Sequence, residues 1–445
     1  MASPRLVHDE YERGCALPST PTAVRYLPPS GFLASRVPTQ ALAAGSVGVL
    51  ASAVNRLLVS RGREPRAWQI DPERVAASFG GDRMLSIDGA PVSAFAPMSG
   101  FFAAGDGWVR THANYPHHRA RLLTALDLPA DADPGVLSTR IGELPAQDIE
   151  DRCADAGAIA VLVRDETAWA GHPQGVASGD GPLVRTRMTD SRHSGPTPSV
   201  ADADRPLAGV RVVDLTRVLA GPVAGRDLAL LGAQVLRVDP PHLHEIDWQH
   251  RDTGQGKRST LLDLTVADDL STMRSLLVST DVLLTGYRPG ALDRFGIADS
   301  TPGLVVGSVS AWGERGPWAM RRGFDSIVQA ASGIALVEGG GRPGALPVQA
   351  LDHASGHLLA AGVVDAIAQR IGDGCGRVVS VSLARTARLL LDLPGRVAAP
   401  VAPRRPSQAT AVTHGGIRAA RPPLPGYAQY PFPAHDWGAD PPHWW

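Results

Sequence analysis

Asp352 and His353 stand in the segment PVQALDHASGHLLAAG, residues 347–362, which otherwise consists of the small and apolar residues typical of a buried helix. A carboxylate at the start of such a helix can accept backbone N–H groups as an N-cap, which contributes about 1 kcal/mol. It can also attack an acyl group as a nucleophile. Local sequence alone favours the cap, because capping is the common use of aspartate there. We expect His353 and His357 to be satisfied core or surface histidines.

The chain contains a second segment of the same kind. PTQALAAG, residues 38–45, matches PVQALDHASG, and each segment is followed by a strand (AWQID; VVSVS) and a further helix (PERVAASF; LARTARLL). This order predicts one helix–strand–helix unit that occurs twice. The first copy lacks the aspartate, so we expect one active site per chain. A similar helix without the charge also favours chemistry over capping for Asp352.

Composition excludes several classes of function. The chain has 445 residues, 44% of them hydrophobic, and a net charge of -1, which gives no basis for binding nucleic acid or an anionic membrane. Cys15, Cys153 and Cys375 form no CxxC or histidine-rich cluster, so no structural metal is expected. The first residues lack a signal-peptide core, which favours the cytoplasm. The run at 41–55 is short and rich in Ala and Gly, and it predicts a packed helix.

Short β-branched runs alternate with helical stretches in the second half of the chain. GVRVVDL (209–215), AQVLRVD (233–239) and DVLLTGY (281–287) are such runs. This alternation predicts an α/β fold with a doubly wound, mostly parallel sheet and ligands at the carboxyl ends of its strands. We expect an N-terminal segment (1–37), a degenerate copy of the repeated unit (38–80), a small α/β domain (81–184), a linker (185–205), a large domain (206–395) and a proline-rich tail without regular structure (396–445).

Five motifs in the large domain occur in a fixed order over about 206–390: PLAGVRVVDLTRVLAGPVAGRDLALLGAQVLRVDPP, GKRSTLLDL, DVLLTGYRPGALDRFGI, GFDSIVQAASG and ALDHASG. Together they resemble the class III CoA-transferases of the formyl-CoA and carnitine-CoA transferase type. FFAAGDGWVRTHANYPHHRARLLTALDLP and EDRCADAGAIAVLVRDETAWAGHPQG resemble that family's small domain, which ordinarily follows the large one. The resemblance implies a permuted order, in agreement with the repeated unit, and an interlocked homodimer.

The resemblance also implies a function. Coenzyme A would pass from an acyl-CoA donor to a small carboxylic acid, without metal or redox cofactor, coenzyme A being part of the substrate. Asp352 falls on the family's nucleophilic carboxylate, which forms a mixed anhydride and then an aspartyl-CoA thioester. The sequence does not name the acid, because acyl pockets are shaped by scattered apolar residues.

CoA-binding positions follow from the same resemblance. They are Arg217, Val218, Leu219, Leu264, Tyr287, Arg294 and Arg322. Tyr287 would stack on adenine, and Arg294 and Arg322 would pair with phosphates. Better-studied transferases have glutamine where Leu219 stands. Each position also fits a structural use, as a turn or a solvated helix charge. Lys257, the only lysine, and its neighbour Arg258 are expected to fix the edge of the CoA groove.

Two other functions stay open. The α-methylacyl-CoA racemases share the fold and place a histidine immediately before the aspartate of the motif that reads GFDSIVQ here. Phe324 occupies that position and cannot abstract a proton, so racemase-like proton transfer is the second hypothesis. A non-catalytic CoA-binding or scaffold homologue is the third.

Overall fold

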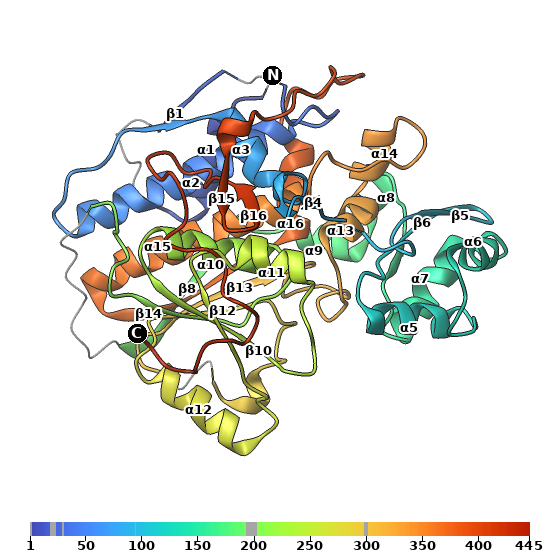
Figure 1. Ribbon diagram of the computed structural model, residues 1–445. Helices are drawn as coiled ribbons and strands as arrows, with labels where there is room; N and C mark the ends of the chain where they lie inside the picture. The colour runs from blue at the N-terminus through green and yellow to red at the C-terminus, as the bar shows by residue number, and fades with distance from the viewer. Residues whose placement is uncertain (1, 18–23, 29–30, 94, 193–202, 298–300) are drawn as a thin grey trace.

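A seven-stranded sheet forms the centre of the large domain (Figure 1). The computed structural model describes residues 2–17, 24–28, 31–93, 95–192, 203–297 and 301–445. In spatial order the strands are β11 (Arg258–Leu261), β10 (Gln234–Asp239), β9 (Arg211–Asp214), β12 (Val282–Thr285), β13 (Val305–Ser310), β14 (Cys375–Ser382) and β8 (Arg185–Arg192). All neighbours pair in parallel except β8, which is antiparallel to β14. The predicted doubly wound, mostly parallel sheet is confirmed.

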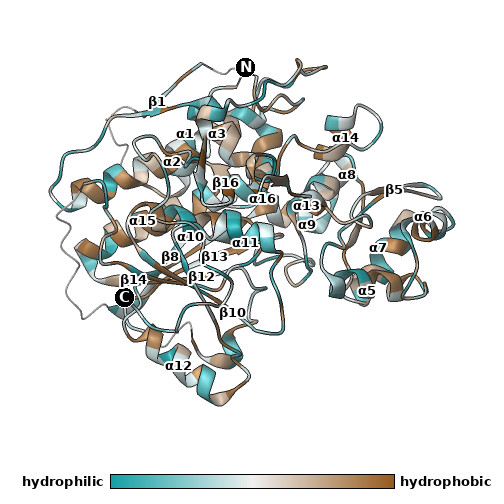
Figure 2. Cartoon of the chain, in the orientation of Figure 1, coloured by the Kyte–Doolittle hydropathy of each residue, from teal (hydrophilic) through white to brown (hydrophobic). Residues whose placement is uncertain are grey.

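Both faces of this sheet are covered, which explains why its strands are nearly continuous apolar runs. Val212 of β9 joins the apolar cluster formed with helices α10 (Ala220–Leu230) and α15 (Ala350–Asp373). Its neighbour Val213 faces the other way and clusters with α12 (Ala267–Leu277). Figure 1 shows α12 on one side of the sheet and α10 and α15 on the other. The central strands are mostly brown in Figure 2, in agreement with burial on both faces.

The strand order reverses between β9 and β12. From β9 the chain passes through α10 to β10 on one side, whereas β12 leads to β13 on the other side. In doubly wound sheets, ligands bind at such a switch point, outside the carboxyl ends of the strands. The loops at 215–219 and 286–288, which follow β9 and β12, are therefore where a ligand is expected.

Helix α2 (Thr39–Ser60) lies along α15 and forms a second helical layer above the sheet (Figure 1). Among the described helices, α2 is the one long and apolar enough to cross a membrane, but 94% of its most apolar stretch is buried within the protein. The prediction of a packed helix at 41–55 is therefore confirmed.

Gly356 determines how closely α15 approaches α10. A Cβ atom at this position would lie 2.5 Å from the backbone oxygen of Ala220 and 2.8 Å from Cβ of Val223. Because a backbone oxygen cannot rotate away, Gly356→Ala is expected to lower the free energy of unfolding by about 1–3 kcal/mol. Gly372, near the exposed end of α15, has open space around it, so Gly372→Ala should stabilise by less than about 1 kcal/mol. Urea unfolding of both variants measures the difference, and equal effects would contradict this account.

Both copies of the repeated unit have the predicted order of elements. The first contains α2, β2 (Trp68–Ile70) and α3 (Pro72–Phe79), and the second contains α15, β14 and α16 (Leu383–Asp392). The two strands are used differently, because β14 belongs to the large sheet, whereas β2 forms a separate two-stranded sheet with β1 (Val24–Tyr26) among the described strands. The origin of the unit by duplication stays a prediction.

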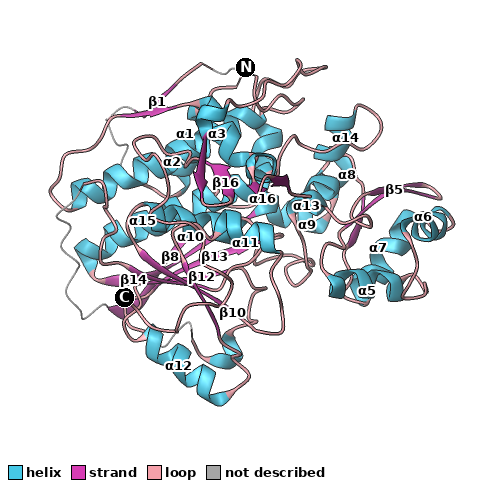
Figure 3. Ribbon diagram, in the orientation of Figure 1, coloured by secondary structure: helices cyan, strands magenta, loops and turns pink. Residues whose placement is uncertain are grey.

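The small domain lies beside the large domain (Figure 3). Its sheet contains β5 (Phe101–Ala104), β6 (Gly107–Thr111) and β7 (Ala160–Leu162), and its main helices are α5 (Pro116–Ala125), α6 (Pro134–Gly142) and α7 (Ala146–Asp155). These elements share a separate apolar core. Helices α8 (Glu166–Gly171) and α9 (Pro173–Gly179) lead back to the large domain, where β6 and β7 contact α13 (Asp325–Ser332).

The expected linker at 185–205 is partly a strand. Residues 185–192 form β8 at the edge of the large sheet, and 193–202 lie outside the described residues. The segment RTRMTDSR has no apolar run, because this edge strand exposes most of its side chains. Its sequence therefore resembles that of a linker.

The expected irregular tail contains a hairpin. Residues 411–420 form β15 (Ala411–His414) and β16 (Ile417–Ala420), which extend a sheet with β3 (Ser86–Ile87) and β4 (Ala90–Pro91). The Gly-Gly pair between the strands is a hairpin signal that the proline-rich surroundings masked.

The other described elements are α1 (Arg5–Gly14), α4 (Gly81–Met84), α11 (Asp247–Thr253), α14 (Ile334–Gly339), η1 (Asp293–Phe295) and η2 (Gln408–Thr410).

Candidate active site

A cavity of about 370 Å³ lies at the switch point, beyond the carboxyl ends of β9 and β12. Residues of both domains line it. The large domain contributes, among others, Leu215, Arg217, Val218, Leu219, Tyr287, Arg288, Arg321, Arg322, Phe324 and Asp352, and the small domain contributes Tyr115, His117 and His118. The position agrees with the rule for doubly wound sheets.

Asp352 is the carboxylate of this cavity. It is the third residue of α15, because the helix begins at Ala350 with Gln349 as its N-cap. The residue is 8% exposed. Within the part of the chain that the structure describes, no hydrogen bond or ion pair reaches its carboxyl oxygens. The capping interpretation is therefore wrong for Asp352, and its carboxyl group is free to react.

A different aspartate caps the helix. Asp325, the first residue of α13, accepts hydrogen bonds through Oδ2 from the backbone amides of Leu351 (2.8 Å) and Asp352 (2.9 Å). Its other oxygen accepts from the side chain of Gln329, which in turn accepts from the amide of Leu346 at 2.9 Å. The first turn of α15 is thus held from a neighbouring helix, and Asp352 is fixed without using its own side chain.

The two aspartates interact electrostatically. Burial raises the pKa of Asp325 to about 6, although the amide of Asp352 and the side chain of Gln329 favour its ionised form. Burial, and then repulsion from Asp325, raise the pKa of Asp352 well above its usual value. A desolvated carboxylate of raised pKa is a stronger nucleophile once ionised, and such shifts are common at functional sites.

The loop between β9 and α10 carries backbone strain. Val218 has φ of +70°, a left-handed conformation that β-branched residues rarely adopt. Strain of this kind costs about 1–3 kcal/mol and persists only where surrounding contacts hold it. Leu219, at the N-cap of α10, is buried and gives the cavity an apolar wall.

The structure brings most of the sequence-assigned residues together. Arg217, Val218, Leu219, Tyr287 and Arg322 all line the cavity of Asp352. Arg294 and Leu264 do not. Arg294 is exposed on η1 and lies over the Phe295 ring at 4.6 Å, whereas Leu264 packs against the apolar cluster below the sheet. Their assigned role in CoA binding stays a prediction.

Sequence reasoning missed the small-domain side of the cavity. Tyr115, His117 and His118 come from the segment NYPHHR, at the start of α5. His112, from the same region, stacks on Phe324 with ring centroids 3.7 Å apart, and His118 contacts the edge of that ring. The run of aromatic and histidine residues was a signal, but only the fold shows which face of the large domain it meets.

His353 and His357 are core residues, one of the expected alternatives, although Nδ1 of His353 and Nε2 of His357 are buried without a described hydrogen-bond partner. His353 stacks on Phe79 of α3 at 5.0 Å, and burial lowers its pKa well below the usual value. Nδ1 of His357 lies 2.6 Å from Oδ2 of Asp227. Neither histidine lines the cavity of about 370 Å³.

Lys257 does not border the cavity. It is buried beneath α10 and donates to Oδ2 of Asp214 (2.8 Å) and to the backbone oxygen of Pro222 (2.7 Å). Burial lowers its pKa to about 8. The expectation that it fixes the edge of a CoA groove is wrong, because its side chain points into the core and joins β9 to α10.

Comparison with known proteins finds CoA-transferases. Residues 207–409 match the model of CoA-transferase family III. An acetyl-coenzyme A transferase of Hypoxylon pulicicidum is 35% identical over 40% of this chain and 32% of its own length. A probable fatty acyl-CoA transferase of Mycobacterium tuberculosis is 32% identical over 40% of this chain and 50% of its own length. A succinyl-CoA–D-citramalate CoA-transferase of Chloroflexus aurantiacus is 32% identical over 40% and 49%.

Solved structures include similar proteins. A crystal structure of a hypothetical protein of M. tuberculosis shares 33% identity over 42% of this chain and 57% of that chain, with a TM-score of 0.38. The chain spans about a third to a half of the length of these curated relatives. The family match begins at residue 207, so the permuted place of the small domain stays a prediction. The similarity to CoA-transferase family III therefore covers residues 207–409, which is the large domain of this chain.

Proposed function

We propose that the chain transfers coenzyme A from an acyl-CoA donor to a carboxylic acid acceptor, with Asp352 as the nucleophile. The observation that carries this proposal is the Asp352 carboxyl group, which lies at the cavity without a described hydrogen-bond partner while Asp325 caps its helix. A buried, unpaired carboxylate is costly, and a costly group is retained where chemistry needs it. The family match supports CoA transfer in general.

The chemistry proceeds through two kinds of acyl intermediate on Asp352. A carboxylate oxygen attacks the thioester carbonyl, the C–S bond breaks, and CoA thiolate leaves a mixed anhydride. The thiolate attacks the carbonyl carbon of Asp352, the donor acid leaves as a carboxylate, and an aspartyl-CoA thioester forms. The acceptor carboxylate then attacks this thioester and expels CoA thiolate, which leaves a second mixed anhydride. The thiolate attacks the acceptor's carbonyl carbon in that anhydride, and the C–O bond to Asp352 breaks to give the acceptor's CoA ester. Asp352 is regenerated without net proton transfer.

The cavity supplies what these steps need. Arg288 and Arg322 line it, and in the described part of the chain neither forms an ion pair with a carboxylate, so they are free to bind anionic groups of the substrate. Leu219 and Phe324 provide apolar walls. Such walls limit the access of water, which would otherwise hydrolyse the anhydride.

Hydroxylamine trapping tests the mechanism. Incubation of the protein with an acyl-CoA and hydroxylamine is expected to convert Asp352 to a hydroxamate, which mass spectrometry of the peptide that contains residues 350–360 detects. Free acids of different size are then screened as acceptors. Absence of the adduct with every acyl-CoA tried, together with absence of transfer, would refute the proposal.

Racemase-like proton transfer is the second candidate, because the structure surrounds Phe324 with histidines. His118 lines the same cavity as Asp352, and His112 stacks on the Phe324 ring. Burial lowers the pKa of His118 to about 2 and that of His112 to about 3, so both rings are neutral at pH 7 but are weak proton acceptors, which places this candidate behind CoA transfer. Incorporation of deuterium from deuterated water at the α-carbon of a 2-methylacyl-CoA would favour this candidate. CoA transfer without exchange would exclude it.

A further inference from the structure

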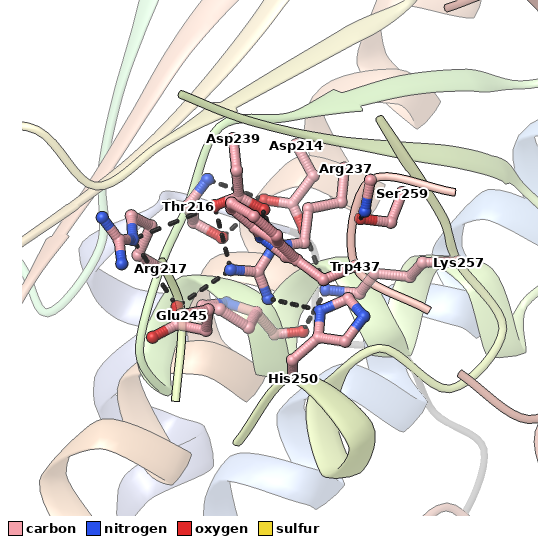
Figure 4. A network of polar contacts seen from close by, with 12 residues as sticks. Asp214, Thr216, Arg217, Arg237, Asp239, Glu245, His250, Lys257, Ser259 and Trp437 are labelled. Atoms are coloured by element: carbon pink, nitrogen blue, oxygen red, sulfur yellow. Dashed lines mark hydrogen bonds and ion pairs between the residues drawn. The ribbon is translucent and has the colours of Figure 1, made fainter. Parts of the chain in front are cut away.

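Glu245 lies in a network of polar side chains with Arg217, Arg237 and Asp239 (Figure 4). Its oxygen Oε1 accepts from the hydroxyl group of Tyr115 in the small domain, and its oxygen Oε2 accepts from the backbone amide of Val218 at 3.1 Å. Arg237 of β10 donates to Oε2 at 2.8 Å, and Nε of Arg217 lies 3.6 Å from the same atom. One carboxylate therefore contacts the small domain, the loop after β9 and the sheet.

Glu245 is held in its charged state by these partners. Its side chain is 1% exposed, and burial alone would raise its pKa. Arg237 and Arg217 outweigh burial and lower the pKa to about 2. Arg237 itself is fixed by Asp239, with Nε 2.6 Å from Oδ2. Arg237 and Asp239 therefore form a buried ion pair on β10, and Arg237 of this pair binds Glu245.

The groups that Glu245 holds are groups that line the cavity. Tyr115, Arg217 and Val218 all line it, whereas Glu245 lies outside the lining. The left-handed backbone of Val218 needs an external contact to persist, and its amide has Glu245 as a partner. Arg217 is fixed further by donation to the backbone oxygen of His244 at 2.9 Å, next to Glu245 in the chain.

We propose that Glu245 is a positioning residue, which holds the strained 216–219 loop and Tyr115 of the small domain in the geometry that binds the CoA ester. Glu245 does not touch the reacting atoms. It positions the side chain of Arg217 and the backbone of Val218. Its hydrogen bond with Tyr115 connects the small domain to this loop. The role of Glu245 in CoA binding rests on the proposed function. Its effect on the conformation of the 216–219 loop does not depend on that function.

Glu245→Gln is the variant that tests this role, because glutamine has the same shape and loses only the charge and one acceptor. The expected result is a rise of about tenfold or more in KM for the acyl-CoA, because small displacements at a site have large effects, with kcat and the acceptor KM changed by less than about threefold. Amide hydrogen exchange over residues 216–222 should accelerate. Tyr115→Phe, which removes one contact of the set, should give a smaller change of the same kind.

Asp281→Asn is the matched control. Asp281 is a buried carboxylate that pairs with Arg370 at 2.7 Å, next to the opposite end of β12 from the cavity. This control should lower Tm and leave exchange at 216–222 and KM unchanged. If Glu245→Gln leaves the exchange unchanged, or if Asp281→Asn accelerates it equally, the inference is overturned. Accelerated exchange specific to the Glu245 variant supports the inference even if the wild-type chain transfers no CoA, a result that would overturn the proposed function alone.

Discussion

Asp352→Asn is expected to reduce CoA transfer by at least roughly 10³-fold, the scale seen when a catalytic nucleophile is removed. Asparagine keeps the shape of the side chain, so the cavity and its affinity for CoA esters should persist. The hydroxylamine adduct should disappear. Initial rates with an acyl-CoA and an acceptor acid, together with calorimetric titration of CoA, measure the two effects separately.

Asp373→Asn serves as the control for this experiment, because Asp373 lies at the far end of the same helix and forms an ion pair with Arg377. It should keep both the adduct and the rate. Full activity of Asp352→Asn would contradict the mechanism, and an adduct on another residue would move the nucleophile elsewhere.

Stability should change in the opposite direction from activity at Asp352. The folded-state pKa of Asp352 is raised, so in wild-type protein the unfolded state loses its proton first as the pH rises above about 4. The free energy of unfolding of the wild type therefore falls between that pH and the raised folded-state pKa, whereas Asp352→Asn escapes this loss. The variant should be more stable by about 1 kcal/mol or more at pH 7 and should lose this advantage below pH of about 4. Thermal unfolding across a pH series checks the sign.

Asp325→Ala is expected to lower the free energy of unfolding by about 2–4 kcal/mol, because it leaves the buried amides of Leu351 and Asp352 without an acceptor. The first turn of α15 carries the nucleophile, so its loosening should also reduce the rate of CoA transfer by about 10²-fold. Chemical unfolding and steady-state rates at one pH measure both effects.

Asp325→Asn separates the cap from the charge. Asparagine retains one oxygen that can accept these amides, but it removes the negative charge that raises the pKa of Asp352. A lower pKa leaves more of Asp352 ionised at a given pH, so the acid limb of the pH–rate profile should move to lower pH. An unchanged or upward-shifted acid limb would show that the Asp325 charge does not act on the nucleophile.

The sheet of the large domain could be predicted because its strands carry their own signal. Burial on both faces requires runs such as VVD and VLLT, and the alternation of these runs with helices fixes a doubly wound order. The tail hairpin and strand β8 could not be predicted in the same way. Strand β8 lies at an edge of the sheet and exposes most of its side chains, so its residues resemble those of a loop, whereas the hairpin lies within a proline-rich stretch that predicts irregular structure.

The site was predicted in part. Asp352 and the loops after β9 and β12 are close in the fold because parallel strands place their carboxyl ends at one edge. The resemblance assigned Arg294 to a CoA phosphate, a role that stays a prediction, and the structure places this side chain exposed on η1, outside the cavity of Asp352. Tyr115, His117 and His118 were not predicted as part of the site. Local sequence patterns do not determine which edge of the sheet the small domain packs against.

The sequence by itself determined the kind of fold, because the apolar periodicity of each element is a local property. It also determined which residue types are available for acyl transfer and that the first repeated unit lacks an aspartate, because both follow from residue identity. Only the tertiary structure decided how Asp352 is used. A capping aspartate and an unpaired aspartate have the same sequence signature. They differ in whether another side chain accepts the backbone amides of the first helical turn. Asp325, distant in sequence and adjacent in space, is that group.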